Sequence, residues 1–282
     1  MKRSSKKHFA TASTVPEVNY RRCLCTYVDV LGFRDLVTQS AENGKIRDRI
    51  RFILDKFRSS YHSKPVPGDI VLTEPPLVVR NFSDLIIRIV PLSDKKLKNG
   101  SVLPLNLAEE ILHEGIDLCG AQFSLLEEGV IVRGGMTVGD LYWEDNQVFG
   151  PALVRAYELE KGLAHYPRIV MDSELVQQLR QIPENLIFSW LNYFREDFDG
   201  LWFVDYLNFY VSMSAPNIIF NRKSFHKPFE KFRTFVVEQL EAQNRISERR
   251  VKYLWLAKYF NSTMDLSPKN SGVNWIDLKI PI

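Results

Sequence analysis

The sequence RCLCTYVDVL occupies residues 22–31 and is followed by Gly32. Its β-branched and apolar residues, ending at a glycine, predict a strand that is buried on both faces. Asp29 stands inside this apolar run, where a charged carboxylate must be compensated. The sequence leaves two roles open for Asp29, as a cap of the following helix or as part of a functional site.

Further elements follow in a regular order. Residues 33–61 form a long amphipathic stretch that is interrupted near Asn43, which indicates helical structure. Two strand-like runs, PLVVRNF (76–82) and DLIIRIVP (84–91), are separated only by Ser83 and predict a tight hairpin. Asp84 at this hairpin is open to two interpretations, a turn residue or a second functional carboxylate.

The sequence from residue 104 to residue 171 indicates further alternating helices and strands. Residues 104–128 predict an amphipathic helix, 129–143 and 146–150 two strands, 151–163 a helix and 167–171 a strand. The order is βαββαβ with a further βαβ. Helices segregated on a mainly antiparallel sheet predict an α+β fold of the ferredoxin-like kind.

The sequence divides into three regions. Residues 1–20 are polar and basic and indicate a flexible leader, 21–175 contain the predicted α+β domain, and 176–282 a mainly helical extension packed on or near it. Within the extension, the run LWFVDYLNFY (201–210) is more typical of a buried core than of a base-stacking surface, because aromatic residues dominate cores.

Bulk composition narrows the classes of function. The 282 residues are 45% hydrophobic and carry a formal net charge of +3, which gives no strong field for nucleic acid. No apolar run approaches a membrane span, and the N-terminus lacks a secretory signal pattern. Cys23, Cys25 and Cys119 form no paired framework, and the first two would point to one face of the strand as small buried hydrophobic residues. Together these features predict a cytoplasmic protein.

The carboxylates of Asp29 and Asp84 would belong to one site if the first strand lies beside the hairpin. Asp29 and Asp84 would then meet at one end of the sheet and repel each other unless a hard divalent cation lies between them. The helix that begins after Gly32 would direct its free N–H groups to the same place, where they can bind phosphates. Carboxylates, divalent metal and a helix N-terminus predict a nucleoside triphosphate site.

Other common chemistries have no motif in the sequence. The histidines are scattered, without a zinc-ligand spacing, and neither a nucleophile elbow nor a Walker A loop occurs.

Five segments occur in the order found in class III nucleotidyl cyclases, and they cover about residues 22–175. The chain resembles that family in YVDVLGF, NFSDLII, VRGGMTVGDLYW, FGPALVRAYELE and PRIVMD. The resemblance implies two Mn²⁺ or Mg²⁺ ions per site and a homodimer with active sites between the subunits. It implies Asp29, Asp84 and the Val30 carbonyl as metal ligands.

The same resemblance implies further binding residues. The backbone N–H groups of Leu31, Gly32 and Phe33 would hold the triphosphate. The positions that select the base in purine cyclases are occupied here by Arg80 and Gln147. Arg80 can donate to a pyrimidine carbonyl, and Gln147 can offer both a donor and an acceptor.

The chain departs from the family pattern in its catalytic helix. The family's catalytic asparagine and arginine fall at Val154 and Glu158. Arg155, Arg133 or Arg168 would have to replace them, because a cation there stabilises charge that develops on the α-phosphate. For each arginine, an ordinary ion pair is the alternative.

These departures, together with the late segment KYLWLAKYFN (252–261), resemble the Pycsar-type pyrimidine cyclases of bacterial antiphage defence. The resemblance implies a bacterial enzyme that converts UTP, or CTP as the less favoured substrate, to the 3′,5′-cyclic mononucleotide and pyrophosphate. The product would act on a separate cyclic-nucleotide-sensing effector. A catalytically silent nucleotide-binding dimer and a purine cyclase remain alternatives.

Overall fold

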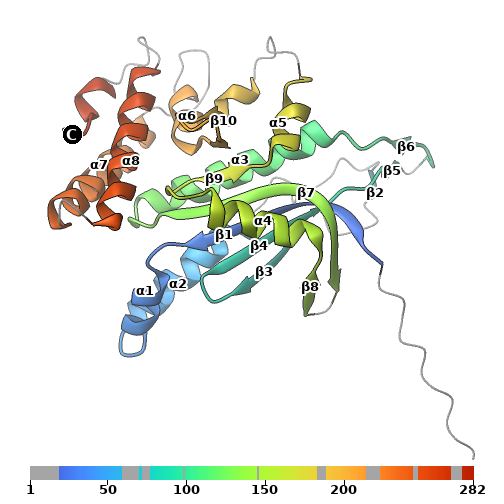
Figure 1. The fold of residues 1–282 in the computed structure, drawn as a ribbon, viewed down its shortest axis with the longest axis horizontal. Coiled ribbons are helices and arrows are strands. Elements are labelled where there is room, and N and C mark those ends of the chain that lie inside the picture. The colour runs from blue at the N-terminus through green and yellow to red at the C-terminus, as the bar shows by residue number, and fades with distance from the viewer. Residues whose placement is uncertain are drawn as a thin grey trace, which may run out of the picture.

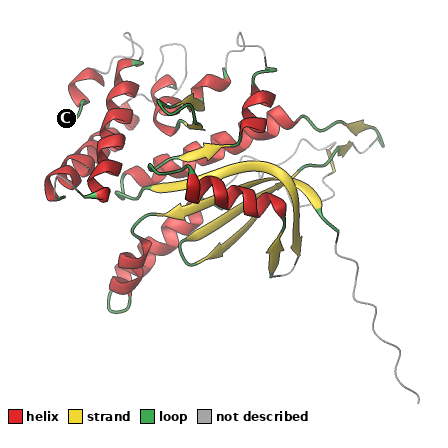
Figure 2. Ribbon diagram, in the orientation of Figure 1, coloured by secondary structure: helices red, strands yellow, loops and turns green. Residues whose placement is uncertain are grey.

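The structure is a computed structural model that describes residues 19–58, 70–71, 77–97, 99–144, 146–182, 189–213, 223–243, 247–267 and 275–282. Helices and strands are mixed along the chain, as an α+β fold requires (Figures 1 and 2). The predicted leader lies outside the described residues except for its last two positions. No helix among the described residues is both long enough and apolar enough to cross a membrane.

One large sheet organises the molecule. Along it the strands lie in the order β10-β11-β9-β7-β1-β4-β3, and β8 pairs with β7. Their bounds are β1 (Arg21–Val30), β3 (Val78–Phe82), β4 (Leu85–Pro91), β7 (Val132–Glu144), β8 (Gln147–Phe149), β9 (Ile169–Met171), β10 (Phe194–Glu196) and β11 (Trp202–Val204). A second, small sheet contains β2 (Ile70–Val71), β5 (Lys95–Leu97) and β6 (Val102–Leu103).

Helices cover both faces of the large sheet (Figure 1). The main ones are α1 (Phe33–Ser40), α2 (Gly44–Lys56), α3 (Leu107–Leu126), α4 (Pro151–Gly162), α5 (Ser173–Leu179), α6 (Tyr206–Ser212), α7 (Lys223–Ala242) and α8 (Glu248–Asp265). The described residues also include the short 3₁₀ helices η2 (Trp190–Asn192) and η3 (Trp275–Leu278). The predicted interruption near Asn43 is confirmed: the Asn43 side chain accepts a hydrogen bond from the Lys45 N–H and begins α2.

Strand β1 lies in the middle of the sheet, antiparallel to β4 on one side and to β7 on the other. Leu24 and Val28 face the core formed with α3, whereas Cys23 and Cys25 face α4. All four side chains are fully buried. The prediction of a strand buried on both faces is therefore confirmed, and so is the role of the two cysteines as small buried residues.

The segment after residue 175 is not only helical. Strands β10 and β11 continue the large sheet beyond β9. Phe203, Val204, Tyr206 and Leu207 of the aromatic run are buried, which confirms its assignment to the core. Helices α7 and α8 pack against each other and, through α7, against α3. Residues from this region and from β1 contribute to one continuous core.

Candidate functional site

Asp29 lies near the end of β1 on the face covered by α4. It is paired in register with Leu85 of β4 and with Arg133 of β7. The Arg133 Nε donates a hydrogen bond to the Asp29 carboxylate at 2.9 Å. The sequence analysis expected a divalent cation to compensate this carboxylate. Arg133 already compensates part of the negative charge of Asp29, so the partial burial of this carboxylate does not by itself require a metal ion.

Asp84 lies directly beside this strand end. The Val30 N–H donates to the Asp84 carbonyl at 3.1 Å. The predicted hairpin is confirmed, and its turn is closed by Ser83, whose φ of 57° lies in the left-handed region. Within the described part of the chain, the Asp84 carboxylate has neither a hydrogen bond nor an ion pair. The fold thus brings the two distant aspartates to one corner of the sheet.

A partly buried tyrosine lies close to both carboxylates. Tyr27 precedes Asp29 by two positions on β1 and therefore faces the same side of the sheet. Burial, and then the negative charges of Glu160, Asp29, Tyr157 and Asp84, raise the pKa of Tyr27 to about 12. Asp29 and Asp84 therefore both lie within electrostatic reach of one phenol.

Glu160 of α4 completes an ion cluster that the sequence analysis missed. Its carboxylate lies 2.7 Å from the Arg133 Nε and is almost fully buried. Burial raises the pKa of Glu160, with the charge of Arg133 acting in the opposite direction. The helical spacing could have predicted that Glu160 faces the core, because Glu160 follows the buried residues Ala152 and Ala156 at intervals of four along the helix.

The turn after β1 carries the predicted phosphate-binding amides. Gly32 has a φ of 78°, a conformation that a side chain would strain. The Leu31 N–H donates to the Ile131 carbonyl at 3.0 Å, so it is already used in holding β1 beside β7. A phosphate would therefore have to compete with Ile131 for this amide. Among the described residues, the N–H groups of Gly32 and Phe33 have no such backbone partner.

The two residues expected to select a base lie at different places. Arg80 of β3 is paired with Ile87, which is paired with Tyr27, so Arg80 shares the face of Asp29. Gln147 is exposed at the start of β8 and is paired with Glu144, at the opposite end of β7 from Arg133. A single chain does not bring Gln147 to the aspartate corner.

Arg155 is directed away from that corner. It donates from Nε and Nη2 to the Asp172 carboxylate at 2.7 and 3.0 Å, and Asp172 also accepts from the Thr137 hydroxyl. Arg155 thus lies beside the β9–α5 junction, whereas Glu160, near the other end of α4, lies beside Arg133. Of the three arginines considered in the sequence, Arg133 is the one that the fold pairs with Asp29 within one chain.

The Arg155–Asp172 pair predicts a pH-dependent stability. The Arg155 hydrogen bond holds the pKa of Asp172 below its ordinary 3.8. Because the folded value is the lower one, the stabilisation is present above the unfolded pKa and is lost as the pH falls through the folded value. Since Arg155 is half exposed, Arg155→Ala should lower the free energy of unfolding at pH 7 by at most about 1 kcal/mol. Urea unfolding should show this difference shrinking below pH 3.8; a difference independent of pH would contradict the argument.

Arg168 has a structural role. Its side chain is fully buried and forms ion pairs with Asp197 and Asp199. The guanidinium also lies near the rings of Tyr166, Phe203 and Trp255. The suggestion that Arg168 replaces the catalytic arginine is therefore wrong, because both of its carboxylate partners are intramolecular and no face of it is open to a substrate.

The donor set at the aspartate corner fits a hard divalent cation only in part. Among the described residues, no group of three or more histidine, cysteine, aspartate or glutamate side chains could hold a metal ion. Asp29, Asp84 and the Val30 carbonyl are oxygen ligands, which Mg²⁺ and Mn²⁺ prefer. Mg²⁺ usually takes one or two carboxylates and completes its shell with water and substrate phosphates. The unpartnered Asp84 carboxylate fits this pattern.

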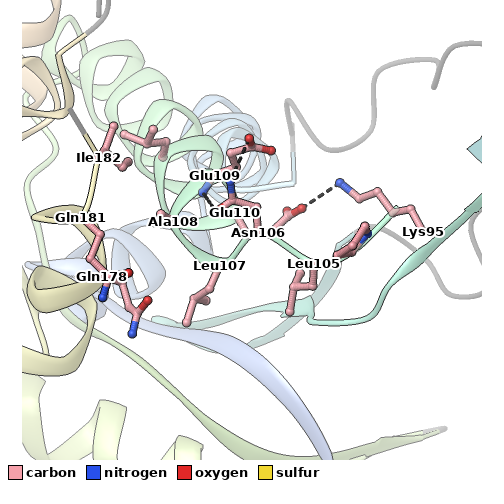
Figure 3. Close-up of a pocket in the computed structure, with 12 residues that line it drawn as sticks. Lys95, Leu105, Asn106, Leu107, Ala108, Glu109, Glu110, Gln178, Gln181 and Ile182 are labelled. Carbon is pink, nitrogen blue, oxygen red and sulfur yellow. Dashed lines mark hydrogen bonds and ion pairs between the residues drawn. The ribbon is translucent and has the colours of Figure 1, made fainter. Parts of the chain in front are cut away.

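A separate pocket of about 890 Å³ lies at the beginning of α3 (Figure 3). Lys95 forms an ion pair with Glu110 on its wall, and Gln178 and Gln181 line the opposite side. It contains none of the residues singled out in the sequence.

No protein-family model matches the chain, and no curated protein matches it. A solved structure described as an adenylate/guanylate cyclase/hydrolase from Silicibacter pomeroyi aligns with 66% of this chain and 98% of its own, at 17% identity and a TM-score of 0.35. A similarity this distant assigns neither a family nor an activity.

Proposed function

We propose that the protein is a nucleotide cyclase that binds a nucleoside triphosphate at the Asp29–Asp84 corner. The observation that carries the proposal is the Val30–Asp84 hydrogen bond, which joins the aspartate-bearing strand end to the hairpin. The antiparallel strand order β7-β1-β4-β3 supports the ferredoxin-like assignment of residues 21–175, with residues 176–282 as an extension built onto the same sheet.

Asp29, Asp84 and the Val30 carbonyl would hold Mg²⁺ or Mn²⁺, which when bound neutralises charge on the triphosphate and on the departing pyrophosphate. The Gly32 and Phe33 amides bind phosphate oxygens at the beginning of α1. Arg133 holds the Asp29 carboxylate in place and adds positive charge close to the α-phosphate. In the reaction, the ribose 3′-oxygen forms a bond to the α-phosphorus and loses its proton, while the bond from that phosphorus to the pyrophosphate oxygen breaks.

A second subunit is part of this proposal. Gln147 and Arg155 lie away from the aspartates of their own chain and would act at the site of the partner. Exposed apolar side chains gather on the α4 side, including Val154 and Tyr157 of α4 and Phe149 of β8. Such exposed apolar residues are typical of an interface. A homodimer would therefore complete each site.

We further propose a pyrimidine substrate, with UTP favoured over CTP. The support is chemical: the Arg80 guanidinium and the Gln147 amide can pair with the carbonyl and ring nitrogen of a pyrimidine. A cyclic pyrimidine nucleotide would act as a signal in antiphage defence through a separate effector.

The test is an assay of the purified protein with each of the four NTPs and Mn²⁺, in which cyclic product and pyrophosphate are measured. The expected result is conversion of UTP, with less conversion of CTP. Conversion of ATP or GTP alone would identify a purine cyclase. Nucleotide binding without product from any of the four would identify a catalytically silent nucleotide-binding dimer. The Arg133–Asp29 ion pair favours this alternative, because Arg133 neutralises a carboxylate that would otherwise bind the metal.

A further inference from the structure

A second pocket opens beside the aspartate corner, between the N-terminal and C-terminal parts of the chain. It has a volume of about 390 Å³ and lies where the turn after β1, the segment before β7, and helices α7 and α8 meet. Its lining includes Leu31, Gly32, Arg49, Arg249, Lys252 and Tyr253. The turn proposed to bind phosphate therefore forms one wall, and helix α8 of the extension forms another.

Lys252 is the most informative residue in this pocket. Its side chain is half buried, yet within the described part of the chain its ammonium group has no hydrogen bond or ion pair. Burial, and then the nearby charge of Arg133, lower the pKa of Lys252, while Asp29 acts in the opposite direction. Lys252 is thus a desolvated cation within electrostatic reach of the proposed metal-binding aspartate.

The other two cations of the pocket differ in how firmly they are held. Arg249 is mostly exposed and lies 3.9 Å from the equally exposed Asp35, a pair worth little in water. Arg49 is engaged with the Glu128 backbone carbonyl and side chain. Arg249 can therefore turn toward an anion, whereas Arg49 of α2 is held by Glu128 in the segment between α3 and β7.

We propose that Lys252, assisted by Arg249, binds the β- and γ-phosphates of the substrate, so that the C-terminal helix α8 supplies the terminal-phosphate part of the site from the same chain. This inference rests on the proposed function, because it takes the anion at the Gly32 turn to be a polyphosphate. A lysine ammonium is a strong point-charge ligand for phosphate. A half-enclosed pocket strengthens its field, and an unpaired buried cation gains more from an anion than one in water.

The geometry has a consequence for substrate selection. In the proposed arrangement the aspartate corner and the Gly32 turn would hold the α-phosphate region, and Lys252, on the α8 wall of the same pocket, would hold the β- and γ-phosphates. Recognition by Lys252 should therefore distinguish triphosphates from monophosphates and leave the choice of base unchanged.

The experiment compares Lys252→Ala with Lys258→Ala, a matched loss of a lysine from an exposed position of the same helix. Calorimetry on the full-length protein measures the dissociation constants of UTP, UMP and inorganic tripolyphosphate. Lys252→Ala is expected to weaken UTP and tripolyphosphate about tenfold, because a hydrogen bond to a charged group is lost, and to leave UMP unchanged. Lys252→Arg should retain most of the affinity, and Lys258→Ala should match wild type.

The inference is overturned if Lys252→Ala binds tripolyphosphate as tightly as wild type does, or if Lys258→Ala weakens it equally. Thermal unfolding of each variant identifies any loss of affinity that is caused by misfolding. If Lys252→Ala is misfolded, tripolyphosphate binding by Lys252→Arg, which keeps the positive charge, tests the proposal instead. Tripolyphosphate binding does not require turnover, so the two proposals can fail separately. A Lys252-dependent anion site in a protein that forms no cyclic product would contradict the cyclase alone. Normal cyclisation with an unchanged KM in Lys252→Ala would contradict the Lys252 site alone.

Discussion

Replacement of Asp84 by asparagine is expected to reduce formation of the cyclic nucleotide by on the order of a thousandfold or more. The substitution keeps the size of the side chain and removes only the charge that would hold a divalent cation. The Asp84 carboxylate has no partner among the described residues, so its loss should not disturb the fold. Pyrophosphate release with Mn²⁺ and UTP measures the effect.

Asp29→Asn should be equally inactive, but its effect on the fold is less simple. Arg133 donates to Asp29 and also lies against Glu160, so the substitution changes the balance of charge in a half-buried cluster. Asp48→Asn on the exposed surface of α2 is the matched control and should retain full activity. An Asp84→Asn protein with normal thermal unfolding and near-normal turnover would contradict the assignment of the site.

The second large effect concerns stability. Arg88 of β4 is fully buried and is bound by Glu114 of α3 through two hydrogen bonds of 2.8 Å, with Asp117 at 3.2 Å. Glu114→Ala removes the main counter-charge and should lower the free energy of unfolding by about 3–5 kcal/mol, because a buried charge loses its partner. Denaturant unfolding at pH 7 measures the change.

Arg51→Ala provides the control for this prediction. Arg51 forms an exposed ion pair with Asp55 on α2, and the loss of such a pair should cost less than about 1 kcal/mol. If Glu114→Ala and Arg51→Ala destabilised the protein to the same small extent, the Arg88–Glu114 pair would not hold α3 to the sheet as argued.

The order of the elements was predictable because each element carries its own local pattern. The apolar run of β1, the hairpin turn at Ser83 and the interruption near Asn43 each depend on a few residues, and the structure has them at the predicted places. The continuation of the sheet into β10 and β11 was not predictable in the same way. These strands are three residues each, too short for an alternating pattern to stand out.

The candidate site was predictable only where a polar residue interrupts an apolar pattern. Asp29 and Asp84 could be found for that reason, and Glu160 could have been. The ion pair between Arg133 and Asp29 depends on the register of β1 against β7, which no local signal fixes. Lys252 could not have been found, because its approach to Gly32 depends on how α8 packs against α7.

The central claim is that Asp29 and Asp84 share a divalent cation that also binds a nucleotide. A crystal grown with Mn²⁺ and a non-hydrolysable UTP analogue tests it, since anomalous scattering locates manganese independently of the protein. We predict manganese within coordinating distance of both carboxylates, with the phosphates against Gly32. Manganese and nucleotide bound together at any other place on the chain would contradict the claim.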